Sequence, residues 1–306
     1  MQSKTAREIA MEQKLLEDFR KAGKISAEVR EYAASLVKAG ALYMDVADKV
    51  EQKIIELGAK PGFPCNISVN DVAAHHVPLA GETLAFKEGD LVKVDFGAHI
   101  NGAVADTAFS VSVKNNPENE KLIEAAGAAL EAAIAKVRPG VKISEIGAAV
   151  ETEIAKRGFL PIKNLCGHSI EQYQLHAGIS IPNYDSKSQT RLEEGMIIAL
   201  EPFATNGNGF ISESQEVGVF RLESDGTVRV GKEILEFIAS EYSTLPFAKR
   251  WLVKKFNPLK VNLFLKEALA KGILHPYNAL VEKKGSKVAQ AEHTILVKEK
   301  PEVLTK

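Results

Sequence analysis

The chain has 306 residues, 45% of them apolar and 26% charged, with a formal net charge of −1. These values predict a globular protein of one large or two modest domains, and the small net charge excludes a general attraction to DNA or to an anionic membrane. The N-terminal segment MQSKTAREIAMEQKLLEDF lacks the apolar core of a signal peptide, and no uninterrupted apolar run reaches the length of a membrane span. We therefore expect a cytoplasmic protein.

An internal repeat predicts the architecture. Residues 37–58 match residues 137–158 at an offset of 100 positions, in glycines, in apolar residues and in their phase. Each copy predicts an amphipathic helix that a glycine closes, Gly58 in the first and Gly158 in the second. Strand-like sequence follows each helix. We expect an α+β fold of two αβ halves related by a pseudo-twofold axis, with helices covering one side of a curved, mainly antiparallel sheet.

A hairpin with one aspartate in each strand is predicted for residues 91–113. The runs LVKVDFG and AVADTAFSVSV flank a turn that contains Asn-Gly, the strongest short signal for a hairpin. If the turn centres on residues 101 and 102, Asp95 lies opposite Ala108 and diagonal to Asp106. If it centres one residue earlier, the two aspartates are directly opposed. Both registers place Asp95 and Asp106 on one face, with Cβ atoms about 4.5 to 8 Å apart.

Three further polar residues lie within or beside apolar stretches: His168 in NLCGHSI, Glu201 in MIIALEP and Glu292 in VAQAEHTILV. Four buried carboxylates would repel one another, and each costs several kcal/mol when isolated, so we expect cations among them. Oxygen ligands with one histidine and no thiolate suit divalent Mn, Fe, Co or Zn, and the two aspartates suit a pair of ions about 3.5 to 4 Å apart. The hairpin alone also permits solvated aspartates on an open sheet face.

Residues 222–280 interrupt the pattern with several short helical segments, and the residues after them are interpreted as a hairpin about Gly285-Ser286. We expect a small, winged-helix-like helical insertion at 222–280. A catalytic domain would comprise 16–221 and 281–306, after a short N-terminal extension at 1–15. The basic run around Trp251 is interpreted as the solvated charges of an amphipathic helix, with weak ribosome or RNA contact as the alternative.

Five motifs resemble, in order and spacing, those of the type 2 methionine aminopeptidases, with the short N-terminus of archaeal members. They are FPCNISVNDVAAHH, VDFGAHINGAVADTAF, NLCGHSIEQYQLHAG, ALEPF and AEHTI, and the match runs from about residue 16 to the C-terminus. The resemblance implies the pita-bread fold and a helical insertion before the last motif. It also implies a dinuclear metallo-aminopeptidase that removes the initiator methionine from nascent proteins when the second residue is small, by metal-hydroxide attack on the first peptide bond.

The resemblance further implies a ligand set for two divalent ions, Co, Mn, Fe or Zn. Asp95 would chelate one ion, Asp106 and Glu292 would bridge both, and His168 and Glu201 would hold the other. Four carboxylates balance two divalent charges, so the ions can lower the pKa of a water without making the site strongly cationic.

The remaining site roles also come from the resemblance. Glu201 would move the proton, and His75 and His176 would hydrogen-bond the substrate and the tetrahedral intermediate. Phe63 and Leu175 match positions that line the pocket for the methionine side chain. The expected partner is the N-terminal methionine of a nascent peptide, with a transient ribosome contact and neither membrane nor DNA. Two alternatives remain: an X-Pro peptidase of the same fold, and a non-catalytic pita-bread binding protein.

Overall fold

The computed structural model describes residues 6–306, so the first five residues of the expected N-terminal extension lie outside the described residues and the rest begin the first helix. None of the described helices combines the length and the apolar character that a membrane crossing requires. The helices are α1 (Ala6–Leu36), α2 (Tyr43–Glu56), α3 (Pro117–Ile134), α4 (Ile143–Lys156), α5 (Lys232–Glu241), α6 (Lys249–Lys255) and α7 (Pro258–Ala270).

The strands between these helices pair in antiparallel fashion. One sheet has the order β1 (Lys60–Val69), β3 (Leu91–Ile100), β4 (Ala103–Ser112). The second has the order β11 (Phe247–Ala248), β10 (Ser212–Leu222), β12 (Leu274–Val281), β2 (Val72–Ala74). The third has the order β13 (Val288–Gln290), β9 (Phe203–Thr205), β5 (Leu160–Pro161). The fourth has the order β15 (Glu302–Val303), β14 (His293–Leu296), β8 (Ile197–Leu200), β6 (Cys166–Ile170), β7 (Ser180–Pro182).

The repeat in the sequence corresponds to a repeat in the structure. Helices α2 and α4 have the same length and begin 100 positions apart, at Tyr43 and Ile143. The glycine after each has a positive φ, 85° at Gly58 and 80° at Gly158, which side-chain-bearing residues adopt only with strain. The predicted α+β class and the two related helices are therefore confirmed.

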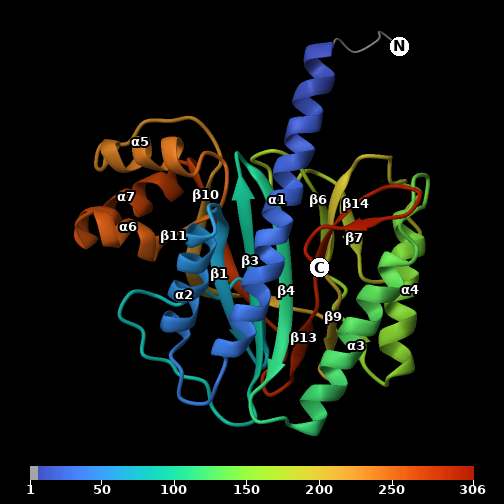
Figure 1. Ribbon diagram of the computed structural model, residues 1–306. Coiled ribbons are helices and arrows are strands. Elements are labelled where there is room, and N and C mark those ends of the chain that lie inside the picture. The colour runs from blue at the N-terminus through green and yellow to red at the C-terminus, as the bar shows by residue number, and fades with distance from the viewer. Residues whose placement is uncertain (1–5) are drawn as a thin grey trace.

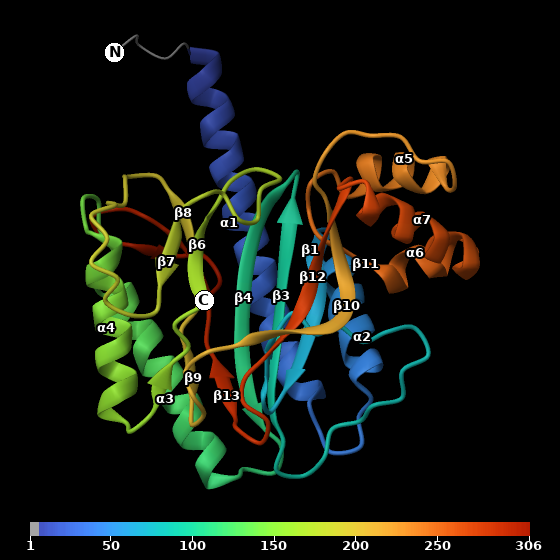
Figure 2. The same cartoon turned by 180° about the vertical axis from the view of Figure 1, so that it is seen from behind.

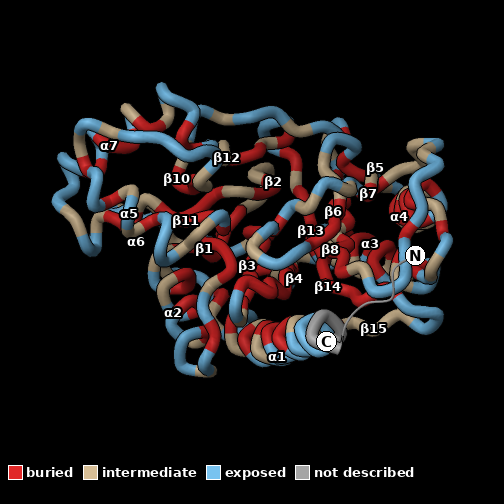
Figure 3. Tube along the Cα trace, turned by 90° about the horizontal axis from the view of Figure 1, so that it is seen from above, coloured by how far each residue is buried: buried red, intermediate tan, exposed pale blue. Residues whose placement is uncertain are grey.

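Helices α1 to α4 cover one side of the curved sheets, and the strands are exposed to view from the other side (Figures 1 and 2). Helices α5 to α7 form a separate group beside β10 and β11. Buried residues lie mainly along the central strands and on the helix sides that face them (Figure 3). The open side of the strands is therefore the side on which a site can be reached.

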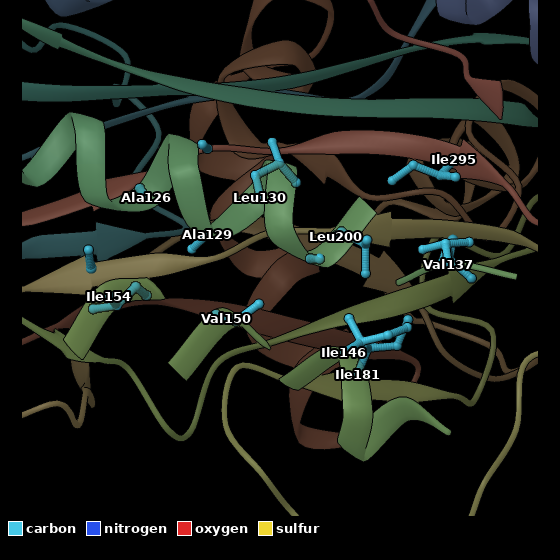
Figure 4. Packing of buried hydrophobic residues seen from close by; sticks show 14 of the residues in the cluster. Ala126, Ala129, Leu130, Val137, Ile146, Val150, Ile154, Ile181, Leu200 and Ile295 are labelled. Atoms are coloured by element: carbon cyan, nitrogen blue, oxygen red, sulfur yellow. The ribbon is translucent and has the colours of Figure 1, made fainter. Parts of the chain in front are cut away.

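The core of the second half shows how sequence periodicity positions the sheet. Small side chains on α3 allow α4 and the strands to approach closely, and apolar residues at helical spacing fill the space between them (Figure 4). The packed residues include Ala126, Ala129, Leu130, Ile146, Val150, Ile154, Leu200 and Ile295, each at most 3% exposed. This packing fixes β8 and β14 and, with them, the residues at their ends.

The hairpin expected about Gly285-Ser286 is wrong. Strand β12 lies between β10 and β2, and β13 pairs with β9, so the two expected partners are in different sheets. Both edges of β12 are already hydrogen-bonded, which leaves none for β13. The turn therefore carries the chain from one sheet to the next.

The expectation that the basic run on α6 is solvated is wrong for one residue. Arg250 is 2% exposed. It forms two hydrogen bonds with Glu51 of α2, one of them 2.7 Å long from Nη1 to Oε2. Its neighbour Lys254 matches the expectation, since its side chain is 57% exposed and pairs with Asp48. A buried acid on α2 thus draws one of the basic residues inward and fastens α6 to the rest of the protein.

Candidate metal centre and substrate cavity

The hairpin of β3 and β4 positions two of the carboxylates. Asn101 and Gly102 form its turn with φ of 52° and 83°, as a two-residue hairpin with the twist of the strands requires. Asp95 pairs with Ala108, two residues from Asp106, which is the first of the two registers considered above. The two aspartates consequently lie diagonally on one face.

The other three candidate ligands come from the second half of the chain. His168 lies on β6, Glu201 follows β8 directly, and Glu292 lies between β13 and β14. The backbone N–H of Glu292 donates to the carbonyl of Ala108 at 2.9 Å. This hydrogen bond joins the C-terminal strands to β4 and places Glu292 beside the hairpin.

The five side chains line one cavity of about 380 Å³. The Nε2 atom of His168 lies 3.6 Å from Asp106 Oδ2 and 3.7 Å from Glu201 Oε1. One ligand atom each from Asp106, His168 and Glu292 lie within 4.8 Å of one another. Asp95 and Glu201 complete the lining. We call Asp95, Asp106, Glu201 and Glu292 the carboxylate cluster.

The electrostatics of the carboxylate cluster favour bound cations. Burial, followed by repulsion from Asp106, raises the pKa of Asp95, Glu201 and Glu292 well above the usual range. Burial also raises the pKa of Asp106, against a hydrogen bond with His168 that lowers it. The Oδ1 atoms of both aspartates are buried and have no hydrogen-bond partner among the described residues. Oxygen donors of this kind fit divalent ions.

Two further histidines face the same cavity. His75 follows β2 with a φ of 61°, an unusual conformation for a non-glycine residue. Its ring centroid lies 5.5 Å from that of Tyr277, and the rings of His168 and His176 are 4.4 Å apart. Burial lowers the pKa of His75 to about 4 and that of His176 well below its usual value, so both rings are neutral at pH 7. A neutral imidazole can donate one hydrogen bond without adding charge.

The apolar part of the cavity contains both predicted pocket residues. Phe63 and Leu175 are 5% and 7% exposed and pack in one hydrophobic cluster. Both line the cavity, together with Ile179 and Val219. The cavity therefore combines an acidic end with an apolar wall.

Two lining or supporting residues were not identified from the sequence. Gln290 is 1% exposed, and its Nε2 donates to Glu201 at 3.4 Å and to Glu292 at 3.5 Å. Its position two residues before Glu292 could have identified it from the sequence, since alternate residues of a strand share a face. Tyr277 could not be identified from the sequence in this way, because its position at the cavity depends on the pairing of β12 with β10.

Comparisons with known proteins show the family to which the chain is similar. Residues 17–299 match the model of metallopeptidase family M24. The chain is 46% identical over 287 residues to the methionine aminopeptidase of Pyrococcus abyssi, which covers 93% of this chain and 97% of that protein. It is 41% identical over 289 residues to the methionine aminopeptidase of Methanothermobacter thermautotrophicus, with 94% and 97% covered.

A solved structure supports the fold. The methionine aminopeptidase of Thermotoga maritima superposes with a TM-score of 0.70 at 24% identity, covering 100% of this chain and 99% of that one. The pita-bread fold expected from the motifs is thereby confirmed. Because the family match spans most of its length, the chain belongs to metallopeptidase family M24.

Proposed function

We propose that the protein is a metal-dependent methionine aminopeptidase, which hydrolyses the first peptide bond of a chain that begins with methionine. The observation that carries this proposal is the single cavity, where a carboxylate–histidine set suited to metal adjoins an apolar wall. The high identity to archaeal proteins of that name supports the same substrate.

The carboxylate cluster and His168 would hold two divalent ions, Co, Mn, Fe or Zn. Asp95, Asp106, His168, Glu201 and Glu292 would each contribute ligand atoms to these ions, as the resemblance to the family implies. When bound, these ions supply Lewis acidity for the scissile carbonyl and lower the pKa of a water. Gln290 holds Glu201 and Glu292 in place through its amide N–H groups.

Glu201 is assigned the proton transfers. Its side chain is 16% exposed at the cavity, so a carboxylate oxygen lies where it can accept a proton from a water and return it. In this assignment a Glu201 oxygen takes a proton from the attacking water and delivers it to the departing amine.

His75 and His176 are assigned to the substrate. Their neutral rings can donate hydrogen bonds to the peptide carbonyl and to the oxyanion that forms from it, which stabilises the tetrahedral intermediate. Tyr277 packs against the rings of both, with centroids 5.5 and 6.2 Å away, and restricts their orientation. Phe63 and Leu175 would contact the methionine side chain of the substrate. The second residue of the substrate, when it is small, would fit at the mouth of the cavity.

The natural substrate is then the N-terminus of a newly made protein. We place the reaction in the cytoplasm, with a transient contact to the ribosome where such N-termini emerge. Neither a membrane nor DNA takes part.

Hydrolysis of a defined peptide set tests this proposal. The metal-depleted protein, reloaded with Co²⁺ or Mn²⁺, should release methionine from Met-Gly and Met-Pro peptides, much more slowly from Met-Leu peptides, and should leave Ala-Pro intact. Cleavage of Ala-Pro without methionine release would indicate an X-Pro peptidase. Absence of all hydrolysis despite bound metal would indicate a binding protein of the same fold.

A further inference from the structure

A second cluster of metal-ligating side chains lies outside the catalytic cavity. It consists of His76, Glu82 and Glu216, each with one ligand atom within 4.8 Å of the others, and none of them lines the cavity. His76 and Glu82 belong to the loop between β2 and β3, and Glu216 belongs to β10. We call these three residues the loop cluster.

His76 is oriented as a ligand. Its Nδ1 lies 2.7 Å from the carbonyl oxygen of Ile67, which can only accept, so Nδ1 carries the proton and donates. The backbone N–H of Ile67 donates to the His76 carbonyl at 2.8 Å and fixes the residue further. Its Nε2 points to the same cluster and lies 3.3 Å from Glu216 Oε1, and the side chain is only 9% exposed. Metal-binding histidines commonly donate their other N–H to a backbone carbonyl in this way.

The two glutamates present oxygens to the same point. Glu82 accepts a 3.1 Å hydrogen bond from the N–H of Leu79 through Oε2, while its Oε1 is buried and has no partner among residues 6–306. Glu216 lies in an irregular part of β10, where the register with β12 shifts between Glu213 and Val217. Such bulges change the direction of a side chain, and here the bulge directs Glu216 toward His76.

We propose that the loop cluster binds one divalent ion of the Mn, Co or Zn class, separate from the ions of the catalytic cavity. One imidazole nitrogen and two carboxylates, without a thiolate, are the donors that such ions accept. A cation among these donors would also balance the negative charge of the two glutamates. Glu216, whose side chain is 42% exposed, leaves the site open to water and to exchange.

The ion would connect two parts that border the catalytic cavity. The loop that starts at His75 already packs tightly on β10, because a Cβ added at Gly218 would lie 2.5 Å from the Val77 side chain. A shared ion would tie this loop to β10 more firmly. Because β10 pairs with β12, which carries Tyr277, the ion would stabilise the wall that holds His75.

Counting bound ions tests the proposal without reference to activity. Wild-type protein, the E216Q variant and the E213Q variant are depleted of metal, dialysed to equilibrium against Mn²⁺ or Zn²⁺, and analysed for metal per chain. Glu213 is exposed on the same strand and is not part of the loop cluster, so E213Q controls for loss of surface charge. We expect E216Q to bind one ion fewer per chain than the other two. Equal numbers in all three, or the same loss in E213Q, would overturn the proposal.

Diffraction from wild-type crystals soaked in Mn²⁺ or Zn²⁺ provides a second measurement that does not depend on a variant. An anomalous peak within bonding distance of His76, Glu82 and Glu216 is expected in addition to any in the cavity. No peak there, with His76 Nε2 still within hydrogen-bond distance of Glu216, would indicate a direct pair rather than a metal site and would overturn the proposal. Both experiments count ions, so their outcome is independent of whether the protein releases methionine.

Discussion

Replacing Arg250 by methionine should destabilise the protein more than any change to an exposed charge on the same helix. Arg250 and Glu51 are 2% and 6% exposed. Without the guanidinium, the Glu51 carboxylate would remain buried with only two hydrogen bonds, from Cys65 N at 3.0 Å and Trp251 Nε1 at 2.8 Å. Breaking a buried pair by removing one partner costs about 3 to 5 kcal/mol. We expect R250M to lower the free energy of unfolding by this amount.

Urea unfolding at pH 7, followed by circular dichroism and tryptophan fluorescence, measures this free energy. The matched control is K254M, whose exposed pair with Asp48 should contribute less than about 1 kcal/mol. The double variant R250M/E51Q also removes the unpaired carboxylate. Its decrease in the free energy of unfolding should therefore differ by about 1 to 3 kcal/mol from the sum of the decreases in R250M and in E51Q. If R250M lost no more than K254M, the buried pair would not hold α6 to α2 as described.

Four other changes test the carboxylate cluster, His75 and the packing of α4. Asp95, Glu201 and Glu292 have pKa values raised above those of the unfolded chain. Their protonated forms therefore stabilise the metal-free fold, and this stabilisation is lost as the pH rises through the pKa values of the folded state. Since protons also compete with metal, chelation should lower the melting temperature more at pH 8 than at pH 5, and an equal or reversed difference would contradict a shared cluster. H75A should reduce turnover by roughly 10²-fold with metal content unchanged, as elemental analysis would show; loss of metal would make His75 a ligand. In thermal melts, G147A should destabilise the protein, because the new Cβ would lie 2.2 Å from the Tyr184 carbonyl oxygen. The control G127A, which places its Cβ in open space on α3, should stabilise the protein by up to about 1 kcal/mol. The opposite order of stability would refute the packing of α4.

Local signals made much of the fold predictable from the sequence. Helices α2 and α4 follow from apolar periodicity and closing glycines, and the β3–β4 hairpin follows from Asn101-Gly102. In each case the residues that decide the structure are close together in the chain. The sequence left two hairpin registers open, and the structure takes the one centred on Asn101 and Gly102.

Features that depend on distant partners were not predictable in this way. Arg250 is buried because Glu51, 199 residues earlier, is buried opposite it. Strand β12 pairs with β10 and β2 rather than with β13, since hydrogen-bonding edges are assigned by the whole sheet. Tyr277 consequently reaches the cavity in a manner that its neighbours in sequence do not indicate. The candidate metal ligands, by contrast, could be identified from the sequence, because burying a charged residue in an apolar strand costs free energy unless it is paired or binds a cation.

Methionine release measured against bound metal, in wild-type protein and in D106N, shows whether the cavity is a metal-dependent active site. Asp106 is 4% exposed and belongs to the group whose ligand atoms converge, and asparagine preserves its shape while removing its charge. Release from a Met-Gly peptide should be absent in metal-depleted wild type and should rise with the ions bound. D106N should keep the wild-type circular dichroism spectrum and release no methionine at saturating metal. Wild-type turnover by D106N would show that the reaction does not depend on a metal held by Asp106.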